Sequence, residues 1–208
     1  MAAVVTLVTI GSARADDLFN NLSAAPTGAD PVGSDWGPLA DSFSTGSSVF
    51  QFTSLKVILN GAPATGSVTA YLLDDSATTP GSILETIGTF DEAELTGGSS
   101  LFTLDTSYFL SPGTRYWIEL TSDDNNANWQ WSLDNSGTGV ADEFVANYQG
   151  SGSWQVFTNL NGPYQMEIAG TPVPEPSSIL LLALGLGALL FLYANRARRT
   201  HHDIPIAG

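Results

Sequence analysis

The chain has 208 residues, six of them basic and twenty-one acidic, so its net charge is −15 at pH 7, and it contains no cysteine. Between residues 16 and 170 there are two basic and nineteen acidic residues, a net charge of −17. That segment repels phosphate groups, which excludes nucleic-acid binding. The lack of cysteine excludes disulfides, thiol nucleophiles and thiolate metal sites.

The first fifteen residues are typical of a secretory signal peptide. Residues 1–10 are small and apolar, and Ala13 and Ala15 form a small-x-small cleavage site directly before Asp16. The usual positive n-region is missing, which indicates a translation start further upstream. We predict a signal peptide over residues 1–15, shortened at its start, and export by the general secretion machinery. A buried N-terminal strand is the alternative.

The segment from 16 to 170 predicts one all-β domain, because short alternating stretches recur about every ten residues between Gly, Pro, Asn, Asp or Ser. The expected strands cover residues 52–59, 68–73, 83–90, 101–104, 116–120, 129–133, 144–148, 154–156 and 164–168. A single acidic helical turn is expected at 91–95. We predict an antiparallel two-sheet β-sandwich, jelly-roll-like, in which each sheet buries one face and exposes the other to water.

Five stretches of this domain, residues 36–44, 55–59, 67–75, 79–84 and 110–118, resemble the choice-of-anchor R domain. That family is a bacterial surface module found with several different C-terminal anchors. The resemblance implies a β fold and a surface location. The resemblance implies no catalytic residue.

The positions of the histidines argue against catalysis in this domain. His201 and His202 are the only two, and both follow the apolar stretch near the C-terminus. A Ser-His-Asp triad and histidine-ligated metal sites are therefore excluded between residues 16 and 170. The number of acidic residues leaves a glycosidase with paired carboxylates possible, although the spacing of these residues in the sequence does not support one. We expect a protein that is not an enzyme.

The acidic stretch at Asp123, Asp124 and Asn126 is a candidate calcium site. It begins like an EF-hand loop, but Trp129 stands at the glycine position and Asn135 at that of the bidentate glutamate. A calcium loop of another kind and an ordinary solvated turn both remain open, since Asp and Asn favour turns. No other cofactor is expected.

Four aromatic residues are candidates for a sugar-binding platform. Trp129 and Trp131 are two residues apart, so on a strand both point to one face. With Tyr148 and Trp154 they could stack on sugar rings of an exopolysaccharide. The alternative is that this face is the core, where large aromatic rings supply much of the buried area.

The C-terminal part predicts a membrane anchor. Residues 171–176 are proline-rich, residues 179–194 are apolar and uncharged, and Arg196, Arg198 and Arg199 follow. Sixteen helical residues span about 24 Å, so flanking residues must complete the roughly 30 Å hydrocarbon core. We predict a transmembrane helix over 177–195 and a basic cytoplasmic tail over 196–208. A soluble core helix without a polar face is the alternative.

The order of these parts resembles the PEP-CTERM sorting signal of Gram-negative bacteria, through Val173, Pro174, Glu175 and Pro176, the apolar span and the arginine cluster. The resemblance implies that an exosortase recognises the Pro-Glu-Pro element and removes the helix. We predict a non-enzymatic exported protein, first anchored in the inner membrane and then located at the cell surface or in the extracellular matrix. A carbohydrate- or calcium-binding adhesion module and a permanently anchored protein are the alternatives.

Overall fold

The computed structural model describes residues 16–33, 37–148, 152–173 and 184–193. The chain divides into two compact units, residues 1–173 and 174–208. The described residues of the first unit form twelve strands and two short 3-10 helices. They are β1 (Asp16–Asn20), β2 (Gly28–Pro31), β3 (Leu39–Ser44), β4 (Phe50–Asn60), β5 (Ser67–Asp75), β6 (Pro80–Asp91), η1 (Glu92–Glu94), β7 (Ser99–Leu110), β8 (Arg115–Ser122), β9 (Asn128–Trp131), β10 (Phe144–Asn147), β11 (Gln155–Thr158), η2 (Asn159–Asn161) and β12 (Met166–Pro172).

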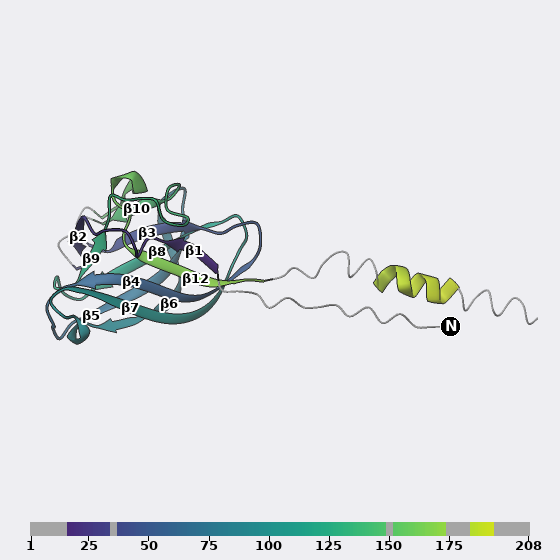
Figure 1. The fold of residues 1–208 in the computed structure, drawn as a ribbon, viewed down its shortest axis with the longest axis horizontal. Coiled ribbons are helices and arrows are strands. Elements are labelled where there is room, and N and C mark those ends of the chain that lie inside the picture. Colours follow the sequence, from purple (N-terminus) through teal and green to yellow (C-terminus); the bar gives the residue numbers. More distant parts are fainter. Residues whose placement is uncertain (1–15, 34–36, 149–151, 174–183, 194–208) are drawn as a thin grey trace, which may run out of the picture. The chain divides into compact units, whose positions relative to one another are not determined.

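The strands form two six-stranded sheets, which confirms the predicted sandwich (Figure 1). The first sheet has the order β1-β12-β4-β9-β2, with β7 paired to the other side of β4, and the second has the order β11-β10-β3-β8-β5-β6. The strand pairs of both sheets are antiparallel. Since β1 and β12 are neighbours, the two ends of the domain's chain lie side by side.

The core lies between the two sheets and follows the predicted period of two. In β4, Phe52, Leu55, Val57 and Leu59 are buried, while the residues between them are half-buried. A bulge where β4 pairs with β7, between Phe52 and Ser54, keeps this face turned inward on both sides of the irregularity. Burial of such side chains contributes most of the folding free energy, at about 25 cal/mol per Å² of apolar surface.

The sequence predicts that the outer face of the second sheet is exposed to water, but part of this face is buried. Ala40, Leu73, Trp117 and Ala146 form a second buried cluster there, separate from the main core. Further apolar side chains pack against it from β5, β10 and the edge of the sheet; they are Tyr71, Phe144, Trp154 and Val156. This sheet therefore excludes water from both of its faces over part of its area.

The turn between β5 and β6 contributes to this outer cluster. Asp75 accepts a hydrogen bond from the Trp117 indole N–H at 2.8 Å and another from the Thr78 backbone N–H at 3.1 Å. Ala77 and Thr78 have φ angles of 52° and 69°, so both central residues adopt the left-handed conformation that a two-residue hairpin turn needs. The turn thus holds Asp75 against the buried Trp117 ring.

Three differences from the predicted elements have simple causes. β7 runs over Ser99–Leu110 rather than 101–104, because it pairs with β4 along nearly its whole length in spite of its polar middle. β1, β2 and β3 are short, and their few apolar residues do not form a long enough alternation to reveal them. β12 continues to Pro172, beyond the predicted domain end at 170.

The second unit contains one described helix, over residues 184–193. Its sequence, from Leu184 to Tyr193, is apolar on every face. Within the described part of the chain, no helix has both the length and the apolar character needed to cross a membrane. The flanks of the predicted span, 177–183 and 194–195, lie outside the described residues.

Candidate functional site

The predicted sorting segment begins where the sandwich ends. Pro172, the last residue of β12, is paired with Phe50 of β4, and the Val173 N–H donates to the Val49 carbonyl at 2.8 Å. Proline has no N–H, so neither Pro174 nor Pro176 can donate a hydrogen bond to a neighbouring strand. In the sequence, the motif begins directly after Val173, which makes the last sheet hydrogen bond among the described residues of β12 and its end. Pro174, Glu175 and Pro176 themselves lie outside the described residues.

The predicted signal-peptide boundary lies beside this point. Asp16 opens β1 and is paired with Gly170 of β12, only two residues before the β12 end. Phe19 of β1 is fully buried in the core. The chain thus enters and leaves the sandwich at the same end of one strand pair. Ala13 and Ala15 lie outside the described residues, as do Arg196, Arg198 and Arg199.

The candidate calcium site has a different composition from the predicted one. Carboxylate oxygens of Glu92, Asp123 and Asp124 lie within 4.8 Å of one another. They converge above Gly66, where an added Cβ would lie 2.7 to 3.0 Å from all three side chains. Asp123 and Asp124 are thus together as predicted, while the third carboxylate comes from η1.

Asn126 takes a different part from the ligand role that the sequence predicts. Its side-chain amide donates to Glu92 Oε2 at 3.1 Å and to the Ala62 carbonyl at 2.7 Å. Its backbone N–H donates to Asp124 Oδ1 at 2.8 Å. Asn126 therefore hydrogen-bonds to the carboxylates of both Glu92 and Asp124. Its side chain turns the amide NH2 group toward Glu92, not the oxygen that could bind a cation.

The electrostatics of this cluster favour a cation. Glu92 is 1% exposed, and its burial, together with the nearby Asp124 carboxylate, raises its pKa, although hydrogen bonds from Ser122 and Asn126 oppose the shift. Three carboxylates this close repel one another, and a divalent cation would relieve that repulsion. Oxygen ligands of this kind suit Ca²⁺, which takes six to eight of them.

The four candidate sugar-platform rings do not form one exposed surface. Trp129 is fully buried, stacked on Tyr164 with ring centroids 4.6 Å apart, and its N–H donates to the Gln165 carbonyl at 3.1 Å. This ring is part of the core, the alternative that the sequence left open, and is unavailable for stacking on a sugar. Trp131 faces the same way as Trp129 but is only half-buried, at the margin of the core.

The other two rings of the predicted platform lie at the second sheet. Tyr148 and Trp154 contact each other edge to face, with centroids 5.4 Å apart. Trp154 also packs against the outer cluster around Trp117. Both rings are half-buried, so this pair could present only part of its area to a ligand.

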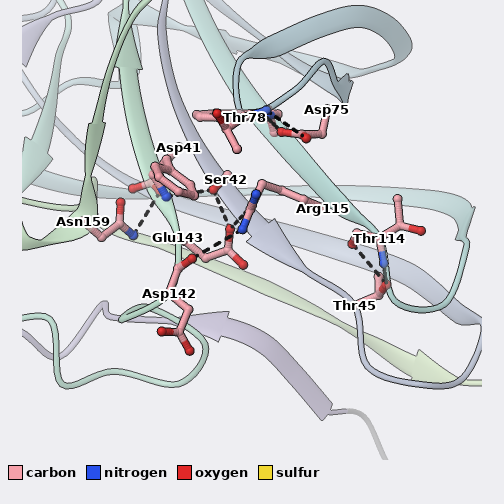
Figure 2. Close-up of polar contacts among 12 residues, drawn as sticks. Asp41, Ser42, Thr45, Asp75, Thr78, Thr114, Arg115, Asp142, Glu143 and Asn159 are labelled. Atoms are coloured by element: carbon pink, nitrogen blue, oxygen red, sulfur yellow. Dashed lines mark hydrogen bonds and ion pairs between the residues drawn. The ribbon is translucent and has the colours of Figure 1, made fainter.

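A buried polar network joins β3, β8 and β10 (Figure 2). Ser42 donates to Glu143 Oε2 at 2.6 Å, and the Arg115 guanidinium donates to the same oxygen at 2.8 Å. Ser42 is fully buried and also accepts from the Phe144 backbone N–H at 2.9 Å. Its hydroxyl is thus held in structural hydrogen bonds, which does not suit a nucleophile.

Asp41 belongs to the same region but faces the core. It accepts from the Tyr164 backbone N–H at 2.7 Å and from the Asn159 amide at 3.4 Å. Complete burial raises the pKa of Asp41 well above its ordinary value, although the two hydrogen bonds oppose this. The side chain fixes η2 and the start of β12 against β3 (Figure 2 shows Asp41 and Asn159).

Comparison with known proteins identifies the C-terminal segment. Residues 172–199 match the PEP-CTERM protein-sorting motif. The match supports an exosortase-processed surface protein and implies an exported, membrane-anchored precursor. Exosortase is therefore the processing partner that the motif implies.

The remaining comparisons add little. No curated protein matches the chain. A solved structure described as "Structure of infectious bursal disease virus Gx strain" aligns with 98% of this chain and 55% of that chain, at 13% identity and a TM-score of 0.30. The present chain thus spans about half the length of that one, and a likeness at this level supports no conclusion about function. The choice-of-anchor R resemblance stays a prediction.

Proposed function

We propose that this protein is a non-enzymatic surface or matrix protein, exported through the general secretion machinery and held in the inner membrane by residues 177–195 until an exosortase releases it. The carrying observation is the sorting-motif match over residues 172–199, which begins within the last residues of β12. The acidic domain supports a place outside the cell, because a net charge of −17 keeps it soluble and away from anionic lipid.

The junction between sandwich and motif suggests how processing proceeds. Up to residue 173, where the described part of the domain ends, the last sheet hydrogen bond is made by Val173, and the Pro-Glu-Pro element follows in the sequence without a spacer. The prolines favour an extended backbone that is not engaged in a sheet, which is the conformation an enzyme can bind. The exosortase then acts close to a folded domain whose own N-terminal strand, β1, lies beside β12.

Replacing Glu175 by glutamine is expected to reduce processing at least tenfold, because the change removes the only charge of the Pro-Glu-Pro element. The full precursor would then accumulate in the inner membrane of a Gram-negative host that has an exosortase. Cell fractionation with intact-mass measurement of the surface-released species reads out both ends of the mature chain. Glu85→Gln is the matched control, since Glu85 is exposed on β6 far from the motif in the sequence.

Equal release of wild type and Glu175→Gln would refute recognition at this element. A released protein that keeps the apolar segment would refute removal of the helix. Persistence of the intact chain in the cytosol, with residues 1–15 uncleaved, would refute export altogether.

A second candidate function, calcium binding by an adhesion module, is favoured by the convergence of Glu92, Asp123 and Asp124. We expect Ca²⁺ to stabilise the chain, since a ligand at 100 times its Kd adds about 2.7 kcal/mol. In a domain of this size that raises Tm by about 5–10 °C. Glu92→Gln should abolish most of the shift, whereas Asp105→Asn, an exposed acid on β7, should leave it intact.

The measurement is calorimetric titration with Ca²⁺ combined with thermal unfolding in the presence of Ca²⁺ and of chelator. Identical melting curves in the two conditions would eliminate this candidate. A shift of the same size in Glu92→Gln would place the ion elsewhere.

A further inference from the structure

A cavity of about 290 Å³ lies between the margins of the two sheets. It is bounded by residues of β2, β9, β10 and β11 and by the segment around η2; they are Asp30, Trp131, Val145, Asn147, Phe157, Asn161, Gly162 and Tyr164. Its volume is near the lower end of small-molecule sites, which measure about 300–1,000 Å³. It therefore suits one ring-sized ligand rather than a chain of several units.

Two of the lining residues carry buried polar atoms without a partner among the described residues. They are the Trp131 indole N–H, a donor, and Asn147 Oδ1, an acceptor. Buried polar atoms are normally paired, because an unpaired one has lost its hydrogen bonds to water without replacement. Both atoms are inaccessible to water in the free chain, so a ligand that offers an acceptor and a donor would pair with them only after a local side-chain shift.

A third polar group is already oriented in the cavity wall. Asp30 accepts a hydrogen bond from the Tyr164 hydroxyl at 3.0 Å, through Oδ2. The second oxygen of this carboxylate has further capacity to accept from a hydroxyl. Asp30 is also the sole charged residue of the lining, so an anion entering the cavity would meet only repulsion.

The rings of the lining are held in place by close packing. Gly28 and Gly162 lie so near the Trp131 ring that an added Cβ would stand 2.4 and 2.8 Å from its atoms. Phe157, from β11, is 43% exposed. A ligand can therefore contact a fixed indole edge and an accessible phenyl ring, surfaces that the apolar faces of a sugar ring complement.

From this combination we infer that the cavity binds a single neutral sugar unit through Asp30, Asn147 and the indole N–H of Trp131. The inference goes beyond the proposed function and depends on it only for the source of the sugar, an exopolysaccharide outside the cell. The site differs from the predicted four-ring platform, of which it keeps Trp131 alone.

The test is a calorimetric titration of the purified full chain in a detergent without a sugar headgroup. The probes are glucose, galactose and mannose, with glucuronate as an anionic counterpart. We expect at least one neutral sugar to bind more tightly than glucuronate, because Asp30 repels an anion. Trp131→Phe and Asn147→Leu should weaken its binding at least tenfold, because the first removes the indole N–H and the second removes the amide oxygen together with its NH2 group.

Two controls separate loss of the site from loss of the fold. Trp154→Phe, a half-buried tryptophan outside the lining, should bind within about twofold of wild type. Asn147→Leu should unfold at the same temperature as wild type or higher, since it removes an unpaired buried acceptor.

Three outcomes would overturn the inference: no heat from any of the three neutral sugars up to about 10 mM, preferential binding of glucuronate, or binding that survives both cavity variants. The titration uses purified chain, so a failure of sorting in cells leaves its result unaffected.

Discussion

Replacing Trp129 by alanine is expected to lower the free energy of unfolding by about 3–5 kcal/mol, the usual cost of removing a large buried aromatic ring. The ring is fully buried and stacks on Tyr164 at 4.6 Å with an interplanar angle of 16°. Alanine also leaves the Gln165 carbonyl without the indole N–H that it accepts at 3.1 Å. Chemical denaturation of the full chain, followed by circular dichroism, gives the value.

The matched control is Leu160→Ala in η2. Leu160 is 68% exposed, so its truncation should change the free energy of unfolding by less than about 0.5 kcal/mol. If Trp129→Ala were equally mild, the ring would not be a core residue, and its use as a sugar platform would have to be reconsidered. Trp129→Phe should fall between the two, because it keeps a ring for Tyr164 and loses the hydrogen bond.

Alternation in the sequence predicts those strands that have one face in the main core. β4, β5 and β8 are of this kind, and the period of two identifies them because every second residue is apolar and buried. β1 shows the limit of the method. It contributes one fully buried side chain, Phe19, to the core, and its two apolar residues, Leu18 and Phe19, are adjacent and so make no alternation.

The outer cluster shows a second limit. Phe144, Ala146 and Tyr148 alternate as the sequence analysis expected, but Val145, the residue between them, is the one that faces the main core. Alternation alone fixes which residues share a face, and it leaves open which face is inside when both are apolar.

The candidate sites were predictable only where their residues are close in sequence. Asp123 and Asp124 are adjacent, and their acidic run indicates a cation site. Glu92 is brought to them only by the fold. It lies in η1, which directly follows β6, and η1 lies beside the loop after β8 that holds the two aspartates. The same holds for the Trp131 cavity, whose polar groups at Asp30 and Asn147 are more than a hundred residues apart and meet only through strand pairing and sheet packing.

Glu119 makes the stability of the fold depend on pH. It lies in β8 between Ala40 of β3 and Tyr71 of β5, on the outer face of the second sheet, and is 9% exposed. Burial raises its pKa from 4.5 to about 7. The folded protein therefore holds a proton that the unfolded chain releases above pH 4.5, and stability falls as the pH rises from about 4.5 to 7.

Glu119→Gln is expected to remove this loss, because glutamine has a similar shape and no charge. A pKa difference of about 2.5 units corresponds to about 3 kcal/mol, so the variant should be more stable than wild type by about that amount at pH 8 and nearly equal to it at pH 4. Denaturant unfolding at both pH values measures the difference. A smaller slope remains in the variant, since burial also raises the pKa of Asp41.

Glu94→Gln separates this effect from a general loss of negative charge. Glu94 is exposed in η1, so its replacement reduces the net charge by the same amount without removing a buried carboxylate. We expect its stability difference from wild type to be within about 0.5 kcal/mol at both pH values. If both variants gained equally at pH 8, repulsion across the acidic surface would be the cause, and the buried position of Glu119 would not matter.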